Sequence, residues 1–166
     1  MSFLTEEQKT LANEISDMLV ARGEKVSVAE SSTGGLISAA LLWVPGASRY
    51  FAGGGVVYTL KSRTALAGAN PDDYKEYRGT TPVLLEKLGA AMQGRLESHW
   101  TVAESGLAGP PGARVAASGK TTVAIIGPVS KTEVLETGSE DREENMILFT
   151  THGLRMFRDA LAEASK

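Results

Sequence analysis

The chain has 166 residues, of which 42% are hydrophobic and 22% are charged, and its formal net charge is −3. These values are typical of one globular domain with a core of its own, and the acidic balance argues against a nonspecific nucleic-acid binder. Cysteine is absent, which excludes disulfides, zinc–thiolate sites and thiol nucleophiles. We see no signal peptide and no apolar run of about 18 residues, so we expect a cytoplasmic protein without a membrane segment.

The first half of the chain alternates between helical and extended patterns. Thr5 and Gln8 fit a capping box, and an apolar stripe with helical spacing continues up to Gly23. The next segments have the following expected bounds: a strand over 25–30, a helix over 36–44, a buried strand over 53–59, a short helix over 60–67 and a polar loop over 70–79. The glycines at the start of the 53–59 strand would permit close backbone approach.

The second half continues the alternation and ends in a long helix. Thr81 and Pro82 fit the N-cap and first positions of a helix whose apolar face reaches Leu96. We then expect a short strand over 101–105, a glycine- and proline-rich loop over 106–119, a hairpin of strands 121–126 and 131–136, and a helix capped by Ser139. Together these segments predict a single α/β domain over residues 1–166, a three-layer α/β/α sandwich with a mixed β-sheet.

The turn from Glu30 to Gly35 joins a predicted strand to a predicted helix and combines hydroxyl side chains with two glycines. Such a turn places hydroxyls at the C-terminal end of a strand and free N–H groups at the start of a helix, which suits a nucleophile or an anion site. The same residues fit a plain turn in which Ser32 or Thr33 caps the helix and the glycines relieve the backbone. Both interpretations remain open on these residues alone.

Three other places carry possible chemistry. Tyr58 stands with Lys61 and Arg63 beyond one strand, and the loop over 105–114 follows another, which is where open α/β sheets usually bind ligands. Each has a structural alternative: a buried strand tyrosine, a solvated cationic face, or a plain connection. The segment 141–142 (Asp-Arg), the remaining place, could equally serve local electrostatics at a helix end.

The two histidines, His99 and His152, have no partner at metal-ligand spacing. Neither do the acidic residues show a ligand pattern, so we expect no metal site.

These motifs together resemble the CinA C-terminal family, the competence/damage-inducible proteins. Residues 29–35 are similar to the family signature Ala-Glu-Ser-Cys-Thr-Gly-Gly, with Ser32 in place of the cysteine. Residues 45–58 resemble its Pro-Gly-Ser-Ser…Phe…Gly-Gly…Tyr segment, residues 105–110 its Ser/Thr-Gly-Ile-Ala-Gly-Pro loop, and residues 138–142 its Gly-Asp-Arg segment. The resemblance runs along essentially the whole chain and corresponds to the stand-alone form, without the extra N-terminal domain of two-domain CinA proteins.

The family includes nicotinamide mononucleotide (NMN) deamidases, which release the amide of NMN as ammonia and leave nicotinic acid mononucleotide. The resemblance therefore implies a hydrolase of NAD metabolism, an amidase with a serine nucleophile and a lysine base. It implies a small-molecule nucleotide substrate, no nucleic-acid or membrane partner, no cofactor, and a homodimer.

The resemblance also assigns roles to residues of this chain. Ser31 becomes the nucleophile, and Tyr58 positions the substrate or shuttles a proton. The expected substrate-binding residues are Glu30, Thr33, Gly34, Gly35, Arg63, Ser105, Gly106, Gly109 and Arg142. Backbone N–H groups near 33–35 would stabilise the oxyanion, and Arg142 with the loop over 106–112 would bind the phosphate.

One position departs from the deamidase pattern. Arg63 stands five residues after the motif tyrosine, where the deamidases carry lysine. Arginine stays protonated and cannot act as an ordinary general base. Lys61 then becomes the candidate base, although an offset of two residues on a helix turns a side chain by roughly 200°.

Two functions follow from this departure. The first is an amidohydrolase that acts on NMN or a related pyridine nucleotide through Ser31, Tyr58 and Lys61. The alternative is a catalytically impaired or re-purposed CinA relative that binds a nucleotide-like phosphate ligand, with Arg63 as an electrostatic clamp.

Overall fold

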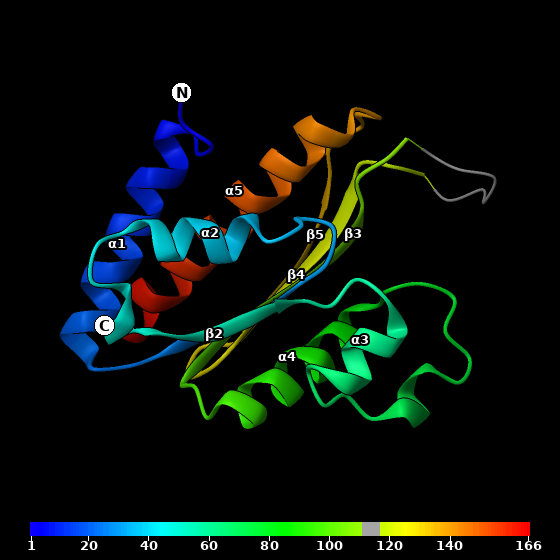
Figure 1. The fold of residues 1–166 in the computed structure, drawn as a ribbon, viewed down its shortest axis with the longest axis horizontal. Coiled ribbons are helices and arrows are strands. Elements are labelled where there is room, and N and C mark those ends of the chain that lie inside the picture. Colours follow the sequence, from blue (N-terminus) through cyan, green and yellow to red (C-terminus); the bar gives the residue numbers. More distant parts are fainter. Residues whose placement is uncertain (111–116) are drawn as a thin grey trace.

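The computed structural model describes residues 1–110 and 117–166 and contains a five-stranded mixed sheet (Figure 1). The sheet order is β2-β1-β3-β4-β5, in which β1 pairs in parallel with β2 and β3 while β3, β4 and β5 pair antiparallel. The strands are β1 (Val26–Glu30), β2 (Phe51–Val56), β3 (Trp100–Leu107), β4 (Lys120–Ile126) and β5 (Lys131–Glu136).

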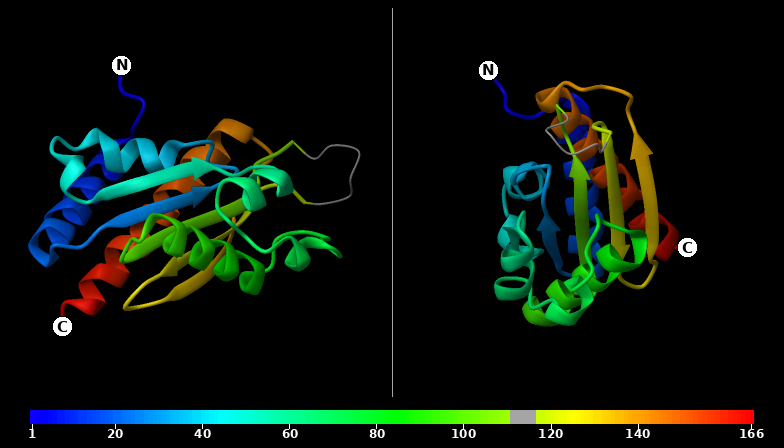
Figure 2. Two further views of the ribbon diagram at one scale, coloured as in Figure 1. Left: turned by 60° about the horizontal axis from the view of Figure 1, so that its bottom comes forward. Right: turned by 90° about the vertical axis from the view of Figure 1, so that its right-hand side faces the viewer.

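Helices cover both faces of this sheet. They are α1 (Glu6–Arg22), α2 (Leu36–Trp43), α3 (Leu60–Ala65), α4 (Pro82–Leu96) and α5 (Arg142–Ala164), with short 3-10 turns at Ala47–Arg49 and Pro71–Tyr74. Helices α1, α2 and α5 pack on one face, and α3 and α4 lie on the other (Figures 1 and 2). The predicted three-layer sandwich with a mixed sheet is thereby confirmed. In the described parts of the chain, no helix is both long enough and apolar enough to cross a bilayer.

Each face of the sheet has its own buried core. On the side of α1, α2 and α5 the core includes Trp100, whose ring centroid lies 5.8 Å from that of Phe157. On the other side, Leu85 and Leu88 of α4 pack against Ala103 and Ala124 of the sheet. Because β1 is buried along its whole length, its C-terminal end is held rigidly between the two helical layers.

Two strand predictions need correction. The strand expected over 53–59 as a buried one is β2, which starts earlier, ends at Val56 and is partly exposed because it forms an edge of the sheet. The close approach expected at its glycines is confirmed, since a Cβ on Gly54 would lie 2.9 Å from Ser38 Oγ. The short strand expected to end at Ser105 continues to Leu107, because its last residues pair with β4.

Two predictions about loops and caps are also corrected. The 70–79 loop contains the 3-10 turn over 71–74. Asp141, not Ser139, is the N-cap of α5, and its carboxylate accepts a hydrogen bond of 2.8 Å from Glu144 N. Aspartate and serine are comparably good N-caps, and here the cap is Asp141, the residue directly before the helix. Part of the long loop expected over 106–119, residues 111–116, lies outside the described residues.

Candidate functional site

A cavity of about 630 Å³ opens where β1, β2 and β3 end. These strands run in parallel, so the segments that follow them meet at one edge of the sheet. Seven of the predicted site residues line this cavity: Ser31, Tyr58, Arg63, Ser105, Gly106, Gly109 and Arg142. The predicted residues Glu30, Thr33, Gly34, Gly35 and Lys61 do not line it.

Glu104 of β3 holds the turn after β1 and was missed by the sequence analysis. Its side chain is completely buried, and its Oε2 accepts hydrogen bonds from Ser31 N at 3.0 Å and Thr33 N at 3.1 Å. Its Oε1 accepts from Thr121 Oγ1 at 2.6 Å and from Ser32 Oγ. The sequence signal that pointed to it was a charged residue within a strand segment, directly after Val102 and Ala103.

Glu30 anchors the start of α2 and does not face the cavity. Its carboxylate accepts hydrogen bonds from Ile37 N at 3.0 Å, Ser38 N at 2.9 Å and Thr33 Oγ1 at 2.6 Å. The N-cap position is occupied by Gly35, which makes no side-chain cap, so the prediction that Ser32 or Thr33 caps this helix is wrong. Instead, the buried carboxylate of Glu30 from the preceding strand accepts the first N–H groups of the helix, at the positive end of the helix dipole.

The expected oxyanion donors are largely occupied. Thr33 N donates to Glu104, and Gly34 N donates to Ser31 O at 3.1 Å. Gly34 and Gly35 have φ values of 64° and 101°, in the left-handed region that favours glycine. The two glycines therefore serve the tight turn, and the prediction of free N–H groups is wrong at positions 33 and 34.

Ser31 lies at the wall of the cavity and is almost completely buried. The residue is 4% exposed, and within residues 1–110 and 117–166 its Oγ has no hydrogen-bond partner. Tyr58 lines the same cavity but is 59% exposed, so it is not the buried strand tyrosine of the structural alternative. Ser31 and Tyr58 therefore share one cavity, but among the described residues no base is hydrogen-bonded to the Ser31 hydroxyl.

Lys61 and Arg63 point in different directions from α3. Lys61 is exposed, whereas Arg63 is only 3% exposed, which confirms that the offset of two residues separates the side chains. Arg63 Nε donates to Val57 O at 3.2 Å, and its Nη2 donates to Ser105 Oγ at 2.8 Å. The solvated cationic face expected as an alternative is therefore right for Lys61 and wrong for Arg63.

The aromatic rings that Arg63 contacts in the described chain are neutral. Its guanidinium lies 6.0 Å and 5.7 Å from the ring centroids of Tyr74 and Tyr77, within range of a cation–π interaction. Burial raises the pKa of Tyr74, and Arg63 opposes that rise, so the phenol stays neutral and supplies no counter-ion. In the described chain, Arg63 forms no ion pair with a carboxylate.

A chain of hydroxyl groups continues from Arg63 across the cavity wall. Ser105 Oγ lies 2.7 Å from Thr80 Oγ1, which lies 3.1 Å from the Tyr77 hydroxyl. Thr80 and Tyr77 both line the cavity and were not among the predicted site residues. Tyr77 comes from the segment 70–79, which was expected to be a polar loop, and Thr80 lies between that segment and the helix predicted from Thr81.

The charge of the cavity wall is positive. Three exposed cationic residues, Arg78, Lys120 and Arg142, line it together with buried Arg63. Among the described lining residues there is no aspartate or glutamate. Arg142 Nη1 donates to Gly109 O at 2.7 Å, and Lys120 lies 3.3 Å from a carboxylate oxygen of Glu136 on the neighbouring strand. The electrostatics therefore favour an anionic ligand.

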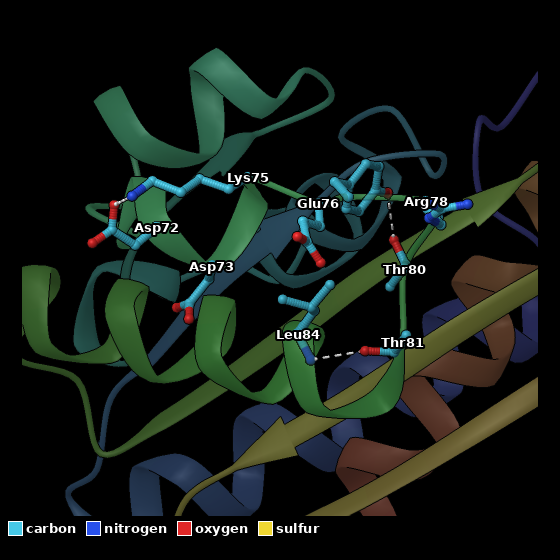
Figure 3. Close-up of a pocket in the computed structure, with 10 residues that line it drawn as sticks. Asp72, Asp73, Lys75, Glu76, Arg78, Thr80, Thr81 and Leu84 are labelled. Carbon is cyan, nitrogen blue, oxygen red and sulfur yellow. Dashed lines mark hydrogen bonds and ion pairs between the residues drawn. The ribbon is translucent and has the colours of Figure 1, made fainter.

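A second cavity, of about 640 Å³, adjoins the first and differs in charge (Figure 3). Its lining includes Asp72, Asp73 and Glu76 together with Lys75, which lies 2.9 Å from Asp72. The two cavities share the segment 77–80 as a wall. In Figure 3, Arg78 of this shared wall lies far from the Asp72–Lys75 pair.

Comparisons with known proteins agree on the family. The chain is 31% identical to the CinA-like protein of Acaryochloris marina over 163 residues, which is 96% of this chain and 39% of that protein. It is 39% identical to the CinA-like protein of Acidobacterium capsulatum over 104 residues, 63% of this chain and 25% of that protein. The chain thus spans less than half the length of these curated relatives.

Solved structures share the fold. The competence/damage inducible protein CihA from Agrobacterium tumefaciens superposes with a TM-score of 0.88 at 24% identity, with all of both chains covered. A competence-damaged protein (CinA) superfamily protein from Klebsiella pneumoniae gives a TM-score of 0.85 at 19% identity, covering 94% of this chain and 98% of that one. The model of the CinA C-terminal domain matches residues 8–161, and the chain belongs to this family.

Proposed function

We propose that this domain binds a nucleotide-like ligand through its phosphate in the 630 Å³ cavity and does not hydrolyse it. The observation that carries the proposal is the buried guanidinium of Arg63 in the cavity wall, at the position where the deamidases have lysine. A guanidinium stays charged at every working pH and attracts anions but accepts no proton. The phosphate would lie near the exposed cations Arg78, Lys120 and Arg142 at the mouth of the cavity.

A second candidate is the amidohydrolase expected from the family resemblance. Ser31 and Tyr58 line the same cavity and favour this function. For catalysis, a base must accept the Ser31 proton within hydrogen-bond reach. Lys61 is exposed and does not line the cavity, so the α3 region would have to rearrange before its amine could take that role. The homodimer and the cytoplasmic location expected from the sequence stay predictions.

The experiment combines binding and turnover. Calorimetry should show that NMN binds to the purified protein, and an Arg142→Gln variant should bind it about tenfold more weakly, as expected for the loss of a charged hydrogen bond. Ammonia release from NMN should be no faster with the wild type than with Ser31→Ala.

Two outcomes would overturn the proposal. Ammonia release that is lost in Ser31→Ala would establish the amidohydrolase, and failure of NMN to bind would remove the nucleotide-binding function. An Arg63→Lys variant sharpens the result: if it gains ammonia release, a lysine at this position restores the base that arginine cannot supply.

A further inference from the structure

Arg63 is a buried charge whose described partners are all neutral. The residue is 3% exposed, and its nitrogens donate to a backbone carbonyl and to the Ser105 hydroxyl. Burial of an unpaired charge is unfavourable, and neutral hydrogen bonds and aromatic rings compensate for it only partly. A guanidinium has five N–H donors, and these two hydrogen bonds leave donors available. The cavity beside it is where an anionic partner could reach those donors.

We propose that Arg63 binds a carboxylate of the ligand, so that the cavity selects a nucleotide whose base carries a carboxylate over one that carries a carboxamide. This inference rests on the proposed nucleotide-binding function and names the ligand class. The phosphate and the carboxylate then bind at different depths of one cavity. The phosphate lies at the exposed cations of the mouth, and the carboxylate lies at buried Arg63.

The chemistry at Arg63 favours a carboxylate over a second phosphate. One guanidinium balances the single charge of a carboxylate, and its planar fork matches a carboxylate in a bidentate arrangement. The nearby groups are two tyrosine rings and the hydroxyls of Ser105 and Thr80, so no second cation is at hand among them for a more highly charged group.

The same chemistry disfavours a carboxamide. A carboxamide offers one acceptor oxygen and directs N–H donors toward the donors of the guanidinium. It also leaves the buried charge of Arg63 without a counter-ion. Selection between the two groups then depends on the attraction between the guanidinium and a carboxylate and on the repulsion between the guanidinium donors and the N–H donors of a carboxamide.

The test compares two probes of nearly equal size and shape, nicotinic acid mononucleotide and NMN, by calorimetry. The wild type should bind the carboxylate probe at least about tenfold more tightly than the carboxamide probe, the scale of one charged hydrogen bond. Arg63→Gln should lose this preference, so that the two probes bind the variant with affinities within about threefold of each other. Arg63→Lys keeps the charge without the fork and should keep part of the preference.

Arg49→Gln is the matched control, because Arg49 is exposed, lies outside the cavity and gives the same change in net charge. It should keep the full preference. Equal affinity of the wild type for both probes overturns the carboxylate assignment and leaves the proposed function standing. A preference that survives in Arg63→Gln also overturns the assignment. Failure of both probes to bind the wild type overturns the proposed function and this inference together.

Discussion

The buried charges next to two walls of the same cavity differ in how far the protein itself satisfies them. Behind the wall formed by the turn after β1, Glu30 and Glu104 are completely buried without lining the cavity, and each carboxylate accepts several hydrogen bonds from the turn and its neighbours. On the wall formed by α3, Arg63 is almost completely buried but has only neutral partners among the described residues.

This difference distinguishes buried charges that stabilise the fold from a buried charge that is available to a ligand. A buried charge whose hydrogen-bonding capacity is filled by the protein fixes the fold around it. A buried charge with donors to spare is poised to accept a ligand, and its burial is tolerated rather than required by the fold. The two glutamates therefore belong to the scaffold of the site, and Arg63 belongs to its recognition surface.

The largest effect is expected for Glu104→Ala. The change removes the acceptor for Ser31 N, Thr33 N and Thr121 Oγ1, and each buried donor left unpaired costs about 1–3 kcal/mol. We expect the free energy of unfolding to fall by about 3 kcal/mol or more, measured by urea denaturation. Glu133→Ala, an exposed residue of β5, is the control and should change it by about 0.5 kcal/mol or less. A loss no larger than that of the control would contradict the scaffold role.

Glu30→Gln should have an intermediate effect. The substitution keeps one acceptor oxygen but removes the charge that faces the first turn of α2, where Ile37 N and Ser38 N donate to it. We expect a loss of about 1–2 kcal/mol in the free energy of unfolding. Faster hydrogen exchange at the Ile37 and Ser38 amides should accompany it. Unchanged exchange at these two amides would show that Glu30 does not stabilise the start of the helix.

Arg63→Met should cost less stability than either glutamate substitution. Methionine fills a similar space, and replacing an unpaired buried charge by an apolar side chain is often close to neutral. We expect a change of about 1 kcal/mol or less in the free energy of unfolding, together with loss of the carboxylate preference in calorimetry. If this variant is destabilised as strongly as Glu104→Ala, Arg63 is part of the scaffold and the contrast between the two walls fails.

His152 gives the smallest effect and tests a buried polar group away from the cavity. Burial lowers its pKa from the ordinary 6.5, with Glu133 opposing that shift and Arg155 adding to it, and its Nε2 has no hydrogen-bond partner in the described chain. The unfolded chain then binds the proton more readily, so stability should fall as the pH drops through 6.5.

Urea denaturation of the wild type and His152→Gln at about pH 7.5 and about pH 5.5 checks this prediction. The variant should lose less stability on acidification than the wild type. Equal losses in both proteins would contradict the assignment.

The fold was predictable because its signals are local. Capping residues such as Thr5 and Thr81, the proline at 82 and the alternation of apolar periods mark elements that the structure confirms. Strand bounds were less predictable, because pairing across the sheet decides them. Gly106 joins β3 only because Thr121 of β4 lies opposite.

The site was predictable in place and only partly in composition. The Ser31 turn, Tyr58, Arg63 and Ser105 do converge on one cavity, as the order of the strands implied. Glu104 was missed because it lies on β3, more than seventy positions along the chain from the turn after β1 that it stabilises. Thr80 was missed for a similar reason, since its contact with Ser105 joins a loop to a distant strand.

In the proposed function, the cavity binds a nucleotide without hydrolysing its amide. A single-turnover experiment tests it most directly: NMN is incubated with an excess of the wild-type protein, and both bound nucleotide and released ammonia are quantified. We predict that NMN is recovered intact from the bound fraction, because Arg63 accepts no proton and Ser31 Oγ has no hydrogen-bonded base among the described residues. Ammonia in an amount matching the bound NMN would show that the domain hydrolyses the amide, and would contradict the proposed binding function.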